Sequence, residues 1–331
     1  MAQKPVRGTR RIESIETQNT DRILSRIAWR DISGGSNMGF SGKESVVNVA
    51  AVQWNPKICQ KKHNIEKSVS LIHDAAKGGA GLIVLPEMCN AGYVFESRSE
   101  AHEQAESIPD GPTCEAWIKV ARQDGVFLVS GMIEKEGFSL HNTAVLIGPN
   151  GYMGKYRKLH EWDKAKLFLE PGNLGLPVFT LPFGRLGMMI CYDGWFPEVP
   201  RVLALKGADI ICDLSNWVVL PTQSKEDYWA LPAHRAHAIF NSVYLVCADR
   251  VGHERGVDYV GNSVIIDLDG SLLAGPASPD EEETIQAEVN VVKSRFHQWS
   301  DFNNPFEDRR TDLFDPLLGY HFPPDSEEFP R

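Results

Sequence analysis

The chain of 331 residues is 42% hydrophobic and 24% charged, values of an ordinary globular protein that exclude wholesale disorder and a coiled coil. Its 34 Lys and Arg against 44 Asp and Glu give a net charge of -10, which argues against nucleic-acid binding because that role needs a basic surface. No stretch approaches the roughly 18 apolar residues that cross a bilayer, and residues 1–11 lack the apolar core of a secretory signal. The six cysteines are scattered, which predicts reduced thiols in a cytoplasmic protein.

The two ends of the chain differ in composition from its centre. Residues 1–45 carry more basic than acidic side chains, and Asp21 could cap a short helix that a Gly pair would end. We interpret this segment as an N-terminal extension that packs on a surface or a neighbouring subunit, with a flexible arm as the alternative. Residues 46–292 predict one domain. The aromatic-rich residues 293–331 predict a C-terminal tail that packs along a surface, such as a subunit interface.

From Val46 onward, apolar patterns predict strands and helices in turn. Strands are expected over 47–54, 81–85, 126–129, 143–147, 152–158, 178–181, 186–190, 209–214, 243–248, 263–266 and 271–274. Helices are expected over 64–77, 113–123, 197–206 and 227–240. Strands that alternate with helices and are interrupted by hairpins predict a mixed α/β fold.

Three reactive side chains follow predicted strands, where mixed α/β proteins place their sites. Cys191 stands in a strand-to-helix turn, where backbone N–H groups favour the thiolate. Glu87 follows the buried run 81–85, and Lys158 ends a predicted hairpin strand. Together a thiol, a carboxylate and an amine supply a nucleophile, a base and a cation for acyl transfer. Taken singly, each has an ordinary alternative: an inert buried thiol, a solvated or capping Glu, and a surface Lys.

Three sequence blocks contain these residues. They are L-I-V-L-P-E-M-C-N-A-G-Y ending at Tyr93, K-Y-R-K-L-H ending at His160, and G-R-L-G-M-M-I-C-Y-D-G-W-F-P-E ending at Glu198. In order and spacing they resemble the nitrilase superfamily of carbon–nitrogen hydrolases, and the likeness runs from about Val46 to the last predicted strand. The resemblance implies an α/β fold of the four-layer αββα type, with mixed parallel and antiparallel sheets, that pairs into an αββααββα dimer.

The resemblance also implies roles for the three residues. Cys191 would be the nucleophile and Glu87 the general base, while Lys158 and the amide N–H of Tyr192 would stabilise the oxyanion. No metal or other cofactor is implied. The reaction would be hydrolysis of a non-peptide C–N bond in a small-molecule amide or N-carbamoyl compound, through a thioester, with release of ammonia or an amine.

The residues after Cys191 help to choose among members of this superfamily. Cys-Tyr-Asp at 191–193 is similar to amidases and N-carbamoyl amine hydrolases, whereas nitrilases usually carry Cys-Trp-Glu. No pair of Arg side chains follows Cys191 to hold a carboxylate, which argues against an amino-acid product. Two alternatives remain: a nitrilase that acts on a small nitrile, and a non-catalytic relative that serves as an interaction protein.

One position departs from the superfamily pattern. Many relatives carry a second pocket carboxylate where this chain has Ala165. Glu161, three residues after Lys158, could supply a carboxylate from another direction, or it could face solvent. If the second carboxylate is absent, the positioning of the substrate is affected more than the reactive groups are.

Aromatic and polar residues near strand ends are candidates for the pocket. Tyr93 and Trp195 could form aromatic walls, Asn216 follows the strand over 209–214, and Trp217 could line the pocket or pack in the core. We interpret His234 and His237 as helix-packing or subunit-contact residues rather than metal ligands, because no companion cluster accompanies them. The expected partners are the substrate and further copies of the chain, as a homodimer or larger homo-oligomer, with no nucleic acid and no membrane.

Overall fold

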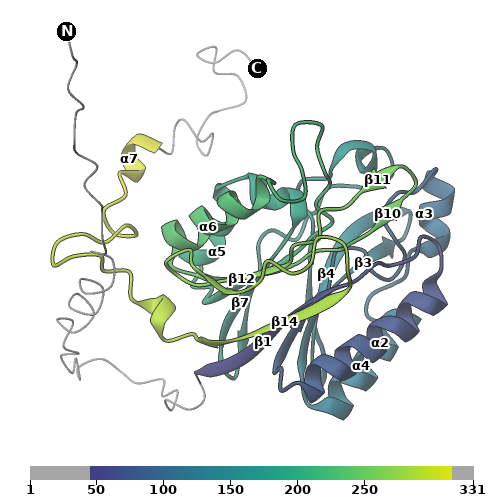
Figure 1. Cartoon of the computed structure of the whole chain (residues 1–331), viewed down its shortest axis with the longest axis horizontal. Coiled ribbons are helices and arrows are strands. Elements are labelled where there is room, and N and C mark those ends of the chain that lie inside the picture. The colour runs from purple at the N-terminus through teal and green to yellow at the C-terminus, as the bar shows by residue number, and fades with distance from the viewer. Residues whose placement is uncertain (1–44, 315–331) are drawn as a thin grey trace, which may run out of the picture. The chain divides into compact units, whose positions relative to one another are not determined.

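The computed structural model describes residues 45–314, which are built around two six-stranded β-sheets (Figure 1). The strands of the first sheet are β1 (Val46–Gln53), β2 (Leu82–Val84), β3 (Phe127–Glu136), β4 (Ser139–Gly148), β5 (Gly151–Arg157) and β14 (Glu283–Asn290). Their order is β14-β1-β2-β3-β4-β5, with β1, β2 and β3 parallel and the outer strands antiparallel to their neighbours.

The second sheet repeats this plan. Its strands are β6 (Val178–Leu181), β7 (Gly184–Ile190), β8 (Ile210–Leu214), β9 (Tyr244–Ala248), β12 (Val264–Ile266) and β13 (Leu272–Ala274), in the order β13-β12-β9-β8-β7-β6. The central strands β7, β8 and β9 are parallel, and the flanking strands are antiparallel. Two short strands, β10 (His253–Glu254) and β11 (Val257–Asp258), form a separate hairpin.

Helices cover the outer face of each sheet. The first sheet is covered by α2 (Lys61–Lys77) and α4 (Pro112–Asp124), and the second by α5 (Glu198–Leu205) and α6 (Ala230–Asn241) (Figure 1). Pro112 at the first helical position and a left-handed Gly125 after the last one fix the ends of α4. Shorter helices are α3 (Arg98–Gln104), α7 (Thr311–Phe314) and the 3-10 turns η1 (Asp163–Leu167), η2 (Cys191–Trp195) and η3 (Lys293–Arg295).

The layers follow from the alternation of side chains along the parallel strands. On β1, Val49 and Ala51 belong to the core between the two sheets, whereas Ala50 and Val52 belong to the core beneath α2 and α4. A strand buried on both faces has few polar positions, which explains why Val49, Ala50, Ala51 and Val52 form a continuous apolar run. The result is the predicted four-layer αββα sandwich, which is confirmed, while the αββααββα dimer stays a prediction.

Every strand and helix predicted between residues 47 and 274 is present, with shifted ends. The largest differences are β3, which continues to Glu136, and β4, which begins at Ser139 rather than Thr143. The sequence analysis did not predict α3, β10, β11, β14 or α7. Of these, only β14 is a full strand of a main sheet, and Ile285, Ala287 and Val289 on it do alternate with polar residues.

The C-terminal tail is described as far as residue 314. Its first part packs on the domain: Ser294 donates to Asp209 at 2.8 Å, and the Phe306 ring lies against the guanidinium of Arg201 at 5.1 Å. Further along, Phe302 is 90% exposed. The domain boundaries and a tail contact with a partner subunit stay predictions, and the N-terminal extension lies outside the described residues. No helix between residues 45 and 314 is long and apolar enough to cross a membrane.

Candidate active site

Cys191 occupies a sharp turn between β7 and η2. Its backbone has a φ of 49°, a left-handed conformation that is costly for a residue with a side chain and persists where surrounding contacts impose it. Two buried carboxylates supply those contacts. Asp213 accepts the Cys191 N–H at 2.7 Å, and Asp193 accepts the Ile190 N–H at 3.1 Å. The turn is therefore held rigidly from both sides.

Glu87 and Lys158 meet although they lie 71 residues apart in the sequence. Glu87 follows β2, Lys158 follows β5, and the ammonium donates to Glu87 Oε1 at 2.6 Å with both side chains fully buried. Asn142 on β4 donates to the same oxygen at 2.5 Å. A Cβ on Gly131 would lie 2.6 Å from the Glu87 Cα, so only glycine lets β3 approach this closely.

Burial sets the electrostatics of the three groups. Burial raises the pKa of the Cys191 thiol well above its usual value, and the charge of Glu87 adds to this rise although Lys158 opposes it. Burial also raises the pKa of Glu87, against the effect of Lys158. Desolvation opposes the charged form of Lys158, but Glu87 keeps its pKa well above the usual value. The expectation that the turn favours a thiolate was therefore wrong, because desolvation outweighs the backbone N–H groups.

A second layer of polar side chains anchors this arrangement. Tyr156 donates its hydroxyl to Asp193 at 2.6 Å, which ties the strand before Lys158 to the Cys191 turn. On the other side, His234 Nε2 lies 2.6 Å from Asp213 Oδ2, and its Nδ1 lies 2.7 Å from the Ala230 carbonyl.

The two histidines of α6 are both buried, and one statement of the sequence analysis about them needs correction. His237 Nε2 donates to the Gly194 carbonyl at 2.7 Å, and burial lowers the pKa of His237 to about 4. His234 does have companions, because potential ligand atoms of Asp213, His234 and Cys247 lie within 4.8 Å of one another. Both ring nitrogens of His234 are already engaged in hydrogen bonds, so the side chain serves to hold Asp213 behind the Cys191 turn.

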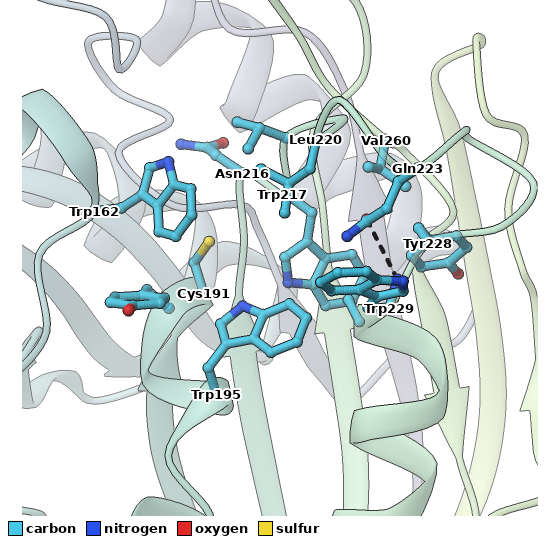
Figure 2. Close-up of a pocket in the computed structure, with 13 residues that line it drawn as sticks. Trp162, Cys191, Trp195, Asn216, Trp217, Leu220, Gln223, Tyr228, Trp229 and Val260 are labelled. Carbon is cyan, nitrogen blue, oxygen red and sulfur yellow. Dashed lines mark hydrogen bonds between the residues drawn. The ribbon is translucent and has the colours of Figure 1, made fainter.

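Cys191 lines a cavity of about 290 Å³ (Figure 2). The figure shows the sulfur at one end of the cavity, on the side of Trp162 and Asn216, with Tyr228 at the other end. The Asn216 backbone N–H donates to the sulfur, and the Asn216 side chain donates to the Glu87 carbonyl at 3.2 Å. The thiol is only 8% exposed, yet it faces a space that a small molecule can fill.

Comparison with known proteins places this arrangement in a family. The sequence profile of the carbon-nitrogen hydrolases matches residues 48–296. The chain belongs to the carbon–nitrogen hydrolase family. It is 45% identical to a nitrilase of Pyrococcus abyssi over 81% of this chain and 99% of that protein. It is 30% identical to the N-carbamoylputrescine amidase of Solanum lycopersicum over 83% of this chain and 96% of that one.

A solved structure agrees with these sequence relatives. The carbon-nitrogen hydrolase from Helicobacter pylori G27 superposes with a TM-score of 0.75 at 28% identity, covering 83% of this chain and 99% of that protein. The resemblance inferred from the three sequence blocks is therefore confirmed. The family acts on amides, nitriles and carbamoyl compounds, and this chain is a carbon–nitrogen hydrolase.

Some of the predicted pocket residues of this carbon–nitrogen hydrolase line the Cys191 cavity, and others do not. Tyr192, Trp195 and Asn216 line the cavity that contains Cys191. Tyr93 does not line it; its ring lies 5.8 Å from Lys158 Nζ, and its buried hydroxyl has no partner in the described part of the chain. Glu161 does not line it either, and instead borders a neighbouring cavity of about 380 Å³ together with Tyr192.

Glu161 is nevertheless an unusual side chain. It is 3% exposed, and neither carboxylate oxygen has a hydrogen-bond partner among residues 45–314. Burial raises the pKa of Glu161 to about 8, against the opposing charge of Lys158. Ala165, where relatives carry a carboxylate, is half-buried and lines a third cavity with Tyr93. That Glu161 supplies the carboxylate missing at Ala165 stays a prediction.

The sequence analysis missed much of the cavity wall. The lining residues that it did not name are Trp162, Leu220, Gln223, Tyr228, Trp229, Ala230 and Val260. Several of them lie between residues 218 and 229, a segment with little regular structure. The only aromatic residues in that segment are Tyr228 and Trp229, and such residues are equally typical of core packing.

Proposed function

We propose that this chain hydrolyses the C–N bond of a small amide or N-carbamoyl compound through a thioester formed on Cys191. The observation that carries the proposal is the fully buried Glu87–Lys158 pair, with 2.6 Å between Oε1 and Nζ, electrostatically coupled to a thiol that faces a cavity. A carboxylate with a raised pKa is a better base than one in water. The names of the amidase relatives support the same reaction type.

In the first half-reaction, the Cys191 thiol loses its proton to Glu87 as the sulfur attacks the amide carbonyl carbon. The carbonyl oxygen gains the negative charge, and the ammonium of Lys158 and the Tyr192 N–H stabilise it. The tetrahedral intermediate then expels the nitrogen, which takes the proton back from Glu87. A thioester remains, and ammonia or an amine leaves.

In the second half-reaction, water replaces the departed nitrogen. Glu87 takes one proton from that water as its oxygen attacks the thioester carbon, and Lys158 again stabilises the oxyanion. Collapse of the intermediate breaks the C–S bond and returns the proton to the sulfur. The carboxylic acid, or the carbamic acid from a carbamoyl substrate, is released with the thiol restored.

Nitrile hydrolysis is the second candidate, and one observation favours it: the Pyrococcus abyssi relative at 45% identity is called a nitrilase. The same thiol would add to the nitrile carbon, and water would convert the thioimidate to the thioester with loss of ammonia. The Cys-Tyr-Asp sequence at 191–193 supports the amide reaction instead. A substrate comparison separates the two reactions directly.

The test measures ammonia release from a panel of amides, N-carbamoyl compounds and nitriles by the full-length protein and by Cys191→Ala. We expect turnover of at least one amide or carbamoyl compound and a fall of at least about 1,000-fold in the variant. Cys59→Ala is the matched control, since Cys59 is half-buried and does not line the Cys191 cavity. Full activity in Cys191→Ala would overturn the nucleophile, and acid formed only from nitriles would favour the second candidate.

A further inference from the structure

The wall of the Cys191 cavity is uncharged. All the lining residues within the described part of the chain are aromatic, aliphatic or neutral polar, and none is Asp, Glu, Lys, Arg or His. Glu87 and Lys158, which act electrostatically on the thiol, are paired with each other at 2.6 Å and lie outside this lining. A substrate that carries a formal charge on its non-reacting part would therefore lose its hydration without gaining an ion pair.

Six of the thirteen residues that line this cavity are aromatic. Four tryptophans line the cavity, and the indoles of Trp195 and Trp229 are 37% and 50% exposed, whereas Trp217 is 4% exposed (Figure 2). Large apolar side chains left partly exposed beside a reactive thiol offer flat surfaces to a ligand. A volume of about 290 Å³ is far more than a one-carbon amide such as formamide needs.

Three side-chain atoms of the lining residues lack hydrogen-bond partners in the described part of the chain, and they indicate which polar groups a ligand should carry. Trp217 Nε1 and Gln223 Nε2 are buried donors without a hydrogen-bond partner in the described residues, and Asn216 Oδ1, beside the thiol, is the corresponding acceptor. A buried donor without a partner is costly, so the ligand is expected to present an acceptor there. An ammonium group is only a donor, so it cannot pair with these two donors, and of the three atoms only Asn216 Oδ1 could accept from it.

We propose that the preferred substrate is an uncharged amide whose acyl group carries an aryl ring or a comparably large apolar group. This inference rests on the proposed amide hydrolysis and narrows it. The aryl group would lie between Trp195, Trp217 and Trp229, and the reacting carbonyl carbon would lie at the Cys191 sulfur. The substrates named for its amidase relatives do not set this preference, because the selection comes from this chain's own cavity wall.

The test compares four primary amides with the wild-type protein: 3-phenylpropanamide, acetamide, the cationic 5-aminopentanamide and the anionic monoamide of glutaric acid. We expect kcat/KM for 3-phenylpropanamide to exceed each of the others by at least about tenfold, since burial of a ring contributes more than one methylene does. An equal or higher kcat/KM for either charged amide, or for acetamide, would overturn the proposal.

Substitution of the exposed indoles tests the same wall. Trp229→Ala and Trp195→Ala are expected to raise KM for 3-phenylpropanamide more than they change kcat, so that its advantage over acetamide falls by about tenfold. Trp299→Ala is the matched control, because Trp299 is 59% exposed and lies outside the cavity lining. Equal losses for both substrates would show a structural effect only and would overturn the role of the wall.

Binding to Cys191→Ala separates this inference from the proposed function. Tryptophan fluorescence of that variant is titrated with 3-phenylpropanamide and with 5-aminopentanamide. Tighter binding of the aryl amide supports the uncharged aromatic site even when the wild-type protein turns over no amide. Failure of the proposed function is the absence of turnover, whereas failure of this inference is equal or tighter binding of the cationic amide.

Discussion

Glu161→Gln tests whether the buried carboxyl near Lys158 destabilises the folded protein when the pH is high enough to ionise it. The side chain is 3% exposed, both of its oxygens lack a hydrogen-bond partner among residues 45–314, and burial raises its pKa to about 8. Glutamine has nearly the same shape and cannot ionise. The substitution therefore removes the titration and keeps the packing.

The expected magnitude follows from the two pKa values of Glu161. The pKa of this carboxyl is higher in the folded protein than in the unfolded chain, so between the two values the folded protein keeps the proton that the unfolded chain has lost. The free energy of unfolding therefore falls as the pH rises through this range. That window runs from 4.5 to about 8. At pH 7 the unfolded chain has ionised and the folded protein has not. The roughly 2.5 pH units above 4.5, at about 1.4 kcal/mol each, reduce the free energy of unfolding by about 3 kcal/mol.

The assay is chemical denaturation of wild type and Glu161→Gln at a series of pH values from 5 to 9. We expect the two free energies of unfolding to approach each other at the acid end and to diverge with rising pH, with the variant more stable by about 3 kcal/mol at pH 7 and about 5 kcal/mol above pH 8. Glu103→Gln, at an exposed helical position, is the control and should show no such divergence. Parallel curves for wild type and Glu161→Gln would refute the reasoning.

Three further substitutions test how the site is held together. Lys158→Met leaves the buried Glu87 carboxylate unpaired and should cost about 3–5 kcal/mol of unfolding free energy; a wild-type denaturation midpoint would contradict an ion pair there. Gly131→Ala puts a Cβ 2.6 Å from the Glu87 Cα and should lower kcat/KM at least about tenfold, measured as ammonia release; unchanged kcat/KM would refute it. His234→Ala removes the hydrogen-bond partner 2.6 Å from Asp213 and should cost about 1–3 kcal/mol, seen as a lower Tm; an unchanged Tm would contradict it.

The fold could be predicted where the sequence has a strong period. The parallel strands are mostly apolar on both faces, and the helices carry an apolar stripe, so β1, β2, β8 and α4 could be recognised from their patterns. Strand β14 is polar on its exposed face and follows a long irregular segment, so its alternation was too weak to recognise alone. Its pairing with β1 is set by contact with a strand more than 200 residues away, which local sequence does not encode.

Some residues of the candidate site could be predicted from the sequence and others could not. Glu87, Lys158 and Cys191 could be named because each stands directly after a recognisable strand in a recognisable block. Their hydrogen-bond partners could not, because Asn142 and Asp213 lie inside strands, where a polar residue gives no clue to what it faces. The aromatic wall was recognised only in part: Trp195 and Trp217 were candidates, whereas Trp162 and Trp229 were not. Nothing in the order of residues in an irregular segment shows which rings turn towards a thiol.

The burial of the site explains why a base is essential to it. An exposed cysteine activated by a helix end would hold a standing thiolate, but the Cys191 thiol has a pKa far above its usual value because it is desolvated beside the Glu87 carboxylate. In the proposed mechanism, the sulfur is therefore a poor nucleophile until its proton moves to Glu87 during attack. Lys158 pairs with the carboxylate in the resting state, and once Glu87 takes the proton, we expect that positive charge to stabilise the oxyanion. Lys158 would thus stabilise both the resting enzyme and the oxyanion, so its loss should reduce both stability and turnover.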